Sequence, residues 1–238
     1  MLELKDYNVF AGEKQILTDI NAKFDPGVHV IMGANGSGKS TLAQSIMGHY
    51  DYRTTGIATI FGIETHALAV WERARHGLFV SAQHPVEMTG ISNFAFILRA
   101  LQSQDKEYNT TKLLADFKRC SRRWNLPEDW HKRDLNVDGS GGEKKKNEFI
   151  QIEMLRPELI ILDEPDSGLD VDAIKELVIF IHEMKEDHDN TVLLISHYET
   201  LITDEDVGVD SVIVLTDGKI SDTGDIELAK EKLKNGFR

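Results

Sequence analysis

The residue types that hold a phosphate chain occur together in one segment, Gly33-Ala34-Asn35-Gly36-Ser37-Gly38-Lys39-Ser40-Thr41. Glycines let backbone N–H groups turn toward phosphate oxygens, and a helix that begins at the end of the segment would add a positive dipole. Lys39 would reach the β- and γ-phosphates, while the Ser40 hydroxyl would bind Mg²⁺. The short apolar run Val28–Met32 comes just before, a setting that a chance glycine-rich turn lacks. We therefore predict a nucleotide site over residues 33–41.

A pair of acidic residues follows a second apolar run. Leu159–Leu162 is continuously apolar, as expected for a buried parallel strand, and it delivers Asp163 and Glu164 to the carboxyl end of that strand. Asp163 would hold the Mg²⁺ shell there, and Glu164 would polarise an attacking water. Together with the upstream phosphate loop, this pair indicates hydrolysis of a nucleoside triphosphate.

Further motifs occur in an ordered series, and on that series the chain resembles the ABC-type ATPases over essentially its whole length. The series continues with a Gln-containing loop, a signature-like segment, a D-loop-like segment and a strand-end histidine. These are Ser81-Ala82-Gln83-His84-Pro85, Ser140-Gly141-Gly142-Glu143, Ser167-Gly168-Leu169-Asp170 and Ile195-Ser196-His197.

The resemblance implies a role for each motif. Catalysis would involve Glu164, His197 and Gln83; Mg²⁺ would be held by Ser40, Gln83 and Asp163. Two copies would pack head to tail, so that each ATP lies between one copy's residues 33–41 and the other copy's Ser140, Gly141 and Gly142. Many members stack adenine on an N-terminal aromatic residue, and Tyr7 and Phe10 are both near the expected position.

Departures from the generic pattern narrow the resemblance to one branch. Gly139 and Glu143 stand where the generic signature has Leu and Gln. The continuation Lys144-Lys145-Lys146-Asn147-Glu148 is similar to SufC-type ATPases, and so is Gln83-His84-Pro85-Val86-Glu87. That branch implies an ATP-driven motor in SUF iron–sulfur cluster assembly, acting on soluble scaffold proteins that resemble SufB and SufD.

Two other functions stay open at this point. The ATPase subunit of an ABC membrane transporter would use the same phosphate chemistry with a separate membrane partner, although the residues after Glu143 disfavour it. A clamp that binds ATP without hydrolysing it would not need both Glu164 and His197.

The elements that must position these residues are those of an α/β fold, which the resemblance specifies as a P-loop NTPase of the ABC ATPase type. Strand-like runs cover Leu2–Val9, Ile16–Phe24 and Ile57–Phe61, which the resemblance assigns to an N-terminal antiparallel β subdomain. Between about residues 86 and 138 strand-like runs are absent, and apolar stripes at helical spacing replace them. We therefore predict a single domain over residues 1–238. Its core covers 1–85 and 151–238, and a helical subdomain is inserted over 86–150.

Composition limits the remaining possibilities. The chain has 238 residues and a formal net charge of −13, which argues against a nucleic-acid binder. Lys144, Lys145 and Lys146 are accordingly predicted to form a solvated helix face. No apolar run approaches the length of a membrane span, so direct membrane insertion is not expected. One cysteine, Cys120, is compatible with a cytoplasmic location and excludes a cysteine-rich cluster site built by this chain alone.

Overall fold

The central sheet of the structure is built from strands that are apolar on both faces. The computed structural model describes residues 1–82, 85–104, 109–188 and 190–237. All residues of three adjacent interior strands are buried, as parallel pairing with cover on both faces requires. In spatial order the sheet contains β12 (Lys219–Gly224), β11 (Val209–Thr216), β3 (Gly27–Met32), β10 (Thr191–Ile195), β9 (Leu159–Asp163) and β6 (Leu78–Val80).

The strand directions bring three sequence motifs to one edge of this sheet. The pairs β11–β3, β3–β10, β10–β9 and β9–β6 are parallel, and only the β11–β12 hairpin is antiparallel among the described strands of this sheet. Asp217 and Gly218 form the hairpin turn, as their sequence predicts. Because parallel strands end at the same edge, the segments after β3, β9 and β10 meet there.

A second, antiparallel sheet is formed mainly by the first sixty residues. Its order is β2 (Lys14–Phe24), β1 (Leu2–Ala11), β4 (Tyr52–Ile60) and β5 (Ile63–Glu64). This sheet is the expected N-terminal antiparallel β subdomain, with strands longer than the apolar runs predicted, because polar residues at their ends also pair.

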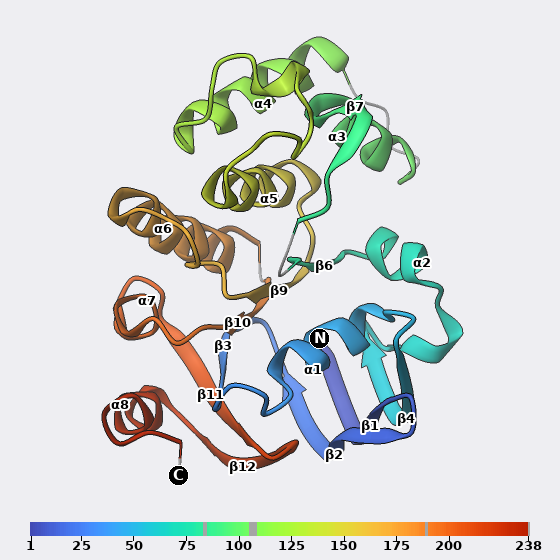
Figure 1. The fold of residues 1–238 in the computed structure, drawn as a ribbon, viewed down its shortest axis with the longest axis vertical. Helices are drawn as coiled ribbons and strands as arrows, with labels where there is room; N and C mark the ends of the chain where they lie inside the picture. The colour runs from blue at the N-terminus through green and yellow to red at the C-terminus, as the bar shows by residue number, and fades with distance from the viewer. Residues whose placement is uncertain (83–84, 105–108, 189, 238) are drawn as a thin grey trace. The chain divides into compact units, whose positions relative to one another are not determined.

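Helix α1 (Lys39–Met47) packs between the two sheets. It contacts β1, β2 and β4 of the antiparallel sheet, and β6 and β9 of the parallel one. Leu42, Ala43 and Ile46 face one shared core that includes Leu4 and Leu193. Figure 1 shows α1 alongside β1 and β2. The helix that follows the phosphate loop is therefore fixed from two sides.

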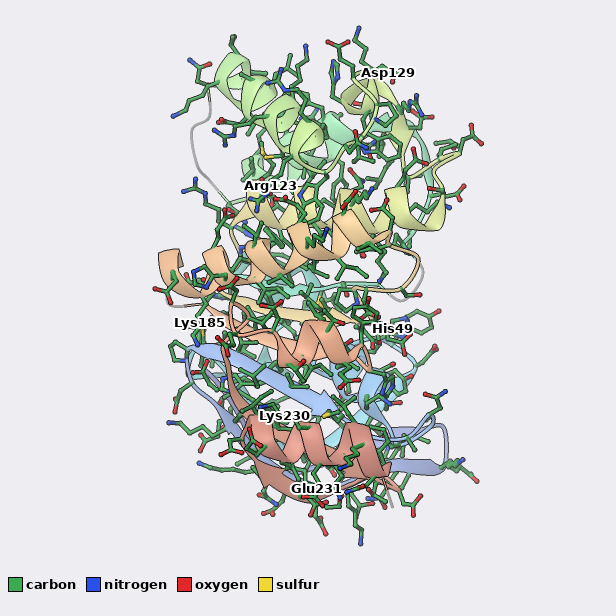
Figure 2. All side chains as sticks on the ribbon, turned by 90° about the vertical axis from the view of Figure 1, so that its left-hand side faces the viewer. His49, Arg123, Asp129, Lys185, Lys230 and Glu231 are labelled. Atoms are coloured by element: carbon green, nitrogen blue, oxygen red, sulfur yellow. The ribbon has the colours of Figure 1, made fainter. Side chains whose placement is uncertain are left out.

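The helical part of the chain is built from α3 (Asn93–Gln102), α4 (Thr110–Arg123) and α5 (Gly141–Leu155). The predicted stripe of α4 is buried through Leu113, Phe117 and Cys120. At the end of α4, Arg123, which is labelled in Figure 2, forms ion pairs with Glu153 of α5 and with Glu176. Helix α3 packs against both α4 and α5.

The absence of strands between about residues 86 and 138 is a wrong prediction. The structure contains a two-stranded antiparallel ladder of β7 (Met88–Ser92) and β8 (Asp134–Leu135). Asp134 also accepts a hydrogen bond from the Gly90 N–H at 2.9 Å. Both strands are short and β7 is mostly exposed, so neither produces the alternation of apolar residues by which strands are found in a sequence.

The described residues group into two compact units. The first comprises residues 1–80, 157–166 and 177–238, and the second comprises 81–156 and 167–176. The division falls within α6 (Val171–His188). The first unit also contains α2 (Val70–Arg75), α7 (Glu199–Thr203), α8 (Ile226–Asn235) and the 3₁₀ turn Thr65–Ala67, and the second contains the 3₁₀ turn Trp130–Lys132. Within the described ranges, no helix is both long and apolar enough to cross a bilayer.

Candidate functional site

The phosphate loop connects β3 to α1 in the first unit. Helix α1 begins at Lys39, and Gly38 precedes it with φ +106° and no side-chain cap on the helix. Its first N–H groups are therefore left to a ligand or to water. Ala34, Asn35 and Gly36 are exposed, whereas Ser37 is buried and its hydroxyl has no hydrogen-bond partner among the described residues. The loop thus offers several polar donors that an anion could accept.

Two glycines of the loop are required by close contacts. A Cβ on Gly33, which has φ +147°, would lie 2.2 Å from the carbonyl oxygen of Leu215. A Cβ on Gly38 would lie 2.4 Å from Leu17 Cδ2. Strands β11 and β2 therefore close in around the loop, and only glycine leaves them room.

Lys39 is folded back onto the loop that contains it. Its side chain is buried, and Nζ donates hydrogen bonds to the carbonyl oxygens of Gly33 at 2.8 Å and Ala34 at 3.0 Å. Burial lowers the pKa of Lys39, while the carboxylates of Glu164 and Asp163 act in the opposite direction. The ammonium is held in the loop and faces two negative charges. Ser40 and Thr41 follow it in the first turn of α1, where Ser40 is half-buried.

The acidic pair lies at the carboxyl end of β9. Asp163 is the last residue of the strand and is only 1% exposed. Glu164 follows with a left-handed backbone, φ +48°, and its N–H donates a hydrogen bond to Ile195 O at 2.8 Å. This bond ties Glu164 to the end of the neighbouring strand β10, so the strained backbone is fixed by its surroundings.

His197 follows β10 by two residues and lies in an environment that disfavours its charged form. Burial lowers the pKa of His197, and the Lys39 ammonium lowers it further. Glu164, Asp166 and Asp163 act in the opposite direction. The preceding residue, Ser196, is fixed by a hydrogen bond from its hydroxyl to Asp166 at 2.6 Å. The imidazole is therefore inclined to stay neutral at neutral pH.

The structure thus brings Lys39, Asp163, Glu164 and His197 together at one sheet edge in the first unit. Their mutual charge effects show that they share one electrostatic environment. Gln83, assigned to catalysis and to Mg²⁺, lies outside the described residues, and so does His84.

The signature-like segment opens α5 in the second unit. Ser140 caps the helix reciprocally with Glu143: the Glu143 N–H donates to Ser140 Oγ at 3.3 Å, and the Ser140 N–H donates to Glu143 Oε2 at 2.8 Å. That backbone hydrogen bond lowers the pKa of Glu143. Glutamate at this position therefore completes the cap.

Gly142 and Gly139 each lie where a side chain would meet a packed neighbour. A Cβ on Gly142 would lie 2.6 Å from the carbonyl oxygen of Gly168, so the signature-like and D-loop-like segments touch through their backbones. A Cβ on Gly139 would lie 3.1 Å from the Trp130 ring. Trp130 therefore crowds the space in which a side chain at position 139 would begin.

The prediction that three lysines form a solvated face is wrong. Lys144, Lys145 and Lys146 pair with Glu87, Glu148 and Asp170, and their side chains are 19%, 6% and 12% exposed. The helix turns each cation toward a carboxylate of the same unit. A negative net charge gives no information about such pairing, because it counts charges without their neighbours.

The Lys145–Glu148 ion pair binds the backbone of Ala82, a contact that the sequence motifs did not predict. Lys145 Nζ and Glu148 Oε2 are 3.6 Å apart, and the two side chains together bind the backbone N–H and C=O groups of Ala82. Glu148 Oε1 accepts the Ala82 N–H at 2.8 Å, and Lys145 Nζ donates to Ala82 O at 3.0 Å. Burial raises the pKa of Glu148, with Lys145 opposing. A Lys-x-x-Glu spacing on a helix could have pointed to the ion pair, but not to its burial.

Other candidate residues have simpler environments. Tyr7 is 2% exposed, so its ring is unavailable for stacking on a base, whereas Phe10 is half-buried with the Arg53 guanidinium 4.1 Å from its ring centroid. Burial raises the pKa of Cys120 to about 12, which leaves it as a packing residue. Among the described residues, no group of three or more His, Cys, Asp or Glu side chains could hold a metal ion.

Comparison with known proteins agrees with this arrangement. The family described as "ABC transporter" matches residues 17–167. "Probable ATP-dependent transporter SufC" of Escherichia coli is 38% identical, with 100% of this chain and 97% of that protein covered. "Vegetative protein 296" of Bacillus subtilis is 36% identical, covering 99% of this chain and 91% of that protein.

Solved structures share the fold. A structure described as "Structure of ATP binding subunit of ABC transporter" superposes with a TM-score of 0.81 at 23% identity, covering 100% of this chain and 94% of that one. The "Dimeric Structure of MJ0796, a Bacterial ABC Transporter Cassette" gives a TM-score of 0.81 at 20% identity, covering 95% and 99%. The α/β fold expected from the sequence is therefore confirmed.

Proposed function

The chain belongs to the ABC transporter family of ATPases, and on that premise we propose that it is a SufC-type motor for iron–sulfur cluster assembly. As a member of this family it binds and hydrolyses ATP. In the proposed role, nucleotide-driven closure of two copies changes the shape of a cytoplasmic scaffold on which the cluster forms. The cluster is the cargo of the scaffold and is not held by this chain.

One observation carries the proposal: the match to SufC of Escherichia coli extends over all of this chain and nearly all of that protein. The segment after the signature supports the same branch. Lys144, Lys145 and Lys146 each have a defined carboxylate partner, which gives this lysine run a structural role in the signature-bearing helix.

In the proposed mechanism, residues 33–41 bind the phosphates of ATP. The uncapped start of α1 and the buried Ser37 hydroxyl supply neutral donors, and Lys39 supplies the positive charge. Lys39 would exchange its present carbonyl partners on Gly33 and Ala34 for phosphate oxygens. The exchange is favourable because an ammonium interacts more strongly with an anion than with a neutral carbonyl.

The donor set proposed for Mg²⁺ fits that ion. Ser40 contributes a hydroxyl, Asp163 a buried carboxylate and Gln83 an amide oxygen, all hard oxygen ligands, and Asp163 lies at the strand end nearest the phosphate loop. When bound, Mg²⁺ would neutralise part of the phosphate charge. Asp163 would keep its position because it belongs to a fully buried strand.

Glu164 and His197 are proposed to act on the attacking water and the γ-phosphate. Glu164 would accept a proton from the water or orient it, and its backbone is fixed to β10 through Ile195. His197 would donate from Nε2 to the γ-phosphate, since that atom is buried without a hydrogen-bond partner among the described residues. Gln83 would link the γ-phosphate to the helical unit.

A second copy of the chain is proposed to complete each site. The segment Ser140, Gly141 and Gly142 opens α5, so its backbone N–H groups and the positive end of the helix are suited to a γ-phosphate from the other copy. Hydrolysis would remove this contact and reopen the pair.

Affinity capture from the native cell tests the assembly role. We expect the tagged chain to retain soluble scaffold proteins of the SufB and SufD kind, and the purified chain alone to lack stoichiometric iron. Lys39→Ala is the matched variant: it should retain the scaffold but lose ATP binding and cluster formation. Stoichiometric capture of an integral membrane protein in detergent would favour the transporter alternative, and a cluster on the isolated chain would contradict the cargo-free role.

A further inference from the structure

An aromatic ring from the C-terminal segment lies against the candidate catalytic histidine. The ring centroids of Phe237 and His197 are 5.9 Å apart, and the rings are inclined at 66°, an edge-to-face arrangement. Phe237 is half-buried. The two residues are forty positions apart in the sequence and no motif of the family includes Phe237, so this contact is visible only in the structure.

Phe237 follows the C-terminal end of helix α8, which fixes its position beside His197. The helix packs on β11, β12 and α7, and Lys232 forms an ion pair with Asp222 of β12 at 3.1 Å. Its opposite side carries Lys230 and Glu231, both exposed (Figure 2). The helix ends at Gly236, whose φ of +82° turns the chain and whose N–H donates to Lys232 O. Phe237 therefore projects from an anchored element.

No hydrogen bond to the described residues fixes Nε2 of the His197 ring, although that atom is buried. An imidazole in this situation can rotate unless packing selects one orientation. The edge-to-face contact with Phe237 is the ring packing that the described part of the chain supplies.

We propose that Phe237 is a positioning residue for His197: its contact selects the ring orientation in which Nε2 makes no hydrogen bond to the described residues and is left for the γ-phosphate. The inference rests on the proposed role of His197 in hydrolysis. In this proposal Phe237 acts on hydrolysis through the imidazole.

Kinetics of Phe237→Ala test this role. An edge-to-face pair changes the population of one orientation by about two- to tenfold, so we expect kcat to fall by that factor while KM for ATP changes little. Phe237→Tyr, which keeps the ring, should restore kcat. Asn235→Ala, at the exposed end of the same helix, is the matched control and should retain the wild-type rate. A wild-type kcat for Phe237→Ala overturns the proposal.

A double-mutant cycle and NMR separate this inference from the role of His197. His197→Ala should remove most turnover, and adding Phe237→Ala to it should cost nothing more. If His197→Ala keeps full turnover, the proposed function of His197 fails. In the free protein, the His197 ring protons should lose a ring-current shift in Phe237→Ala but not in Asn235→Ala. Unchanged His197 signals in Phe237→Ala would contradict the contact itself, whatever the outcome for turnover.

Discussion

At the scale of single residues, Glu164 combines a left-handed backbone with a carboxylate beside Lys39 and His197. A φ of +48° is uncommon for a residue other than glycine, and the N–H bond to Ile195 holds it. Strain of this kind fixes the direction of one side chain. A substitution that replaces only the carboxylate of Glu164 should therefore leave the fold unchanged.

Glu164→Gln should retain ATP binding and lose turnover by about 100-fold or more, because the amide keeps the size of the side chain but cannot accept the proton. Steady-state hydrolysis and binding of a fluorescent ATP analogue measure the two effects separately. Glu158→Gln, at an exposed position just before the same strand, is the control and should hydrolyse ATP at the wild-type rate. Intact hydrolysis in Glu164→Gln would remove this residue from the mechanism.

His29 makes stability depend on pH. Its ring is buried in β3, with Nε2 2.7 Å from Asp25 O and Nδ1 2.8 Å from Ser211 Oγ. The carbonyl requires a proton on Nε2, so the neutral ring accepts from the serine hydroxyl through Nδ1. Burial lowers the pKa of His29, opposed mainly by its hydrogen bond to Asp25.

Because the unfolded chain binds a proton near pH 6.5 and folded His29 does so only at lower pH, the free energy of unfolding should fall as pH drops below about 6.5. In His29→Gln this part of the fall should be absent. Urea unfolding between pH 7.5 and pH 5 measures it. Equal pH dependence in the two proteins would contradict this assignment.

At the scale of elements, the close approach of Gly142 to Gly168 limits which residues can occupy the start of α5. Gly142→Ala should destabilise the protein by about 1–3 kcal/mol, because a Cβ 2.6 Å from a carbonyl oxygen forces the backbone to shift. Gly141→Ala is a close control, since a Cβ there meets nothing within 4 Å. Thermal unfolding of both variants should show a lower Tm for Gly142→Ala alone. Equal Tm values would mean that the backbone of the D-loop-like segment can shift at little cost in free energy.

Helix α5 also fixes the chain at Ala82 through a buried ion pair. Glu148→Gln would leave the Lys145 ammonium without its compensating carboxylate, at a cost of about 3 kcal/mol in the free energy of unfolding. Glu87→Gln removes the partner of Lys144 at a position where the carboxylate is half exposed, and should cost less than about 1 kcal/mol. Urea unfolding compares them, and equal losses would show that burial does not decide the strength of these pairs.

At this scale, some elements could be predicted from sequence patterns, whereas other contacts are seen only in the three-dimensional structure. Apolar runs predicted β3 and β9, and the residues just after them, with the strand-end position expected for His197, predicted which side chains meet at the sheet edge. The β7–β8 ladder, the Ala82 contacts and the Phe237–His197 contact could not be predicted, because each joins residues far apart in the chain. The lysines after Glu143 were misjudged because a helical pattern shows which residues share a face but not what lies opposite.

At the scale of the whole molecule, the two segments proposed to contact nucleotide belong to different compact units of the chain. Residues 33–41 lie in the first unit, and Ser140, Gly141 and Gly142 lie in the second. A head-to-tail pair would join one unit of each copy at every ATP. Such an arrangement makes each site depend on two molecules.

Mixing two inactive variants tests that dependence. Lys39→Ala and Ser140→Arg should each be inactive alone. Mixed in equal amounts, they should recover about a quarter of the wild-type rate, because half of the pairs are mixed and each mixed pair has one intact site of two. Lys39→Ala with Gly141→Arg should behave alike, whereas Lys39→Ala with Glu164→Gln should give no recovery, as both defects lie in the first unit. No recovery in any mixture would contradict a shared site.

The contact between Gly142 and Gly168 has a consequence for how this sequence can change over evolutionary time. A methyl group at position 142 needs the backbone at position 168 to move, and residue 168 holds a φ of +76° that side chains resist. Neither position can acquire a larger residue independently at low cost. We therefore expect both positions to stay glycine among descendants of this chain, because neither residue can become smaller to make room for a side chain at the other.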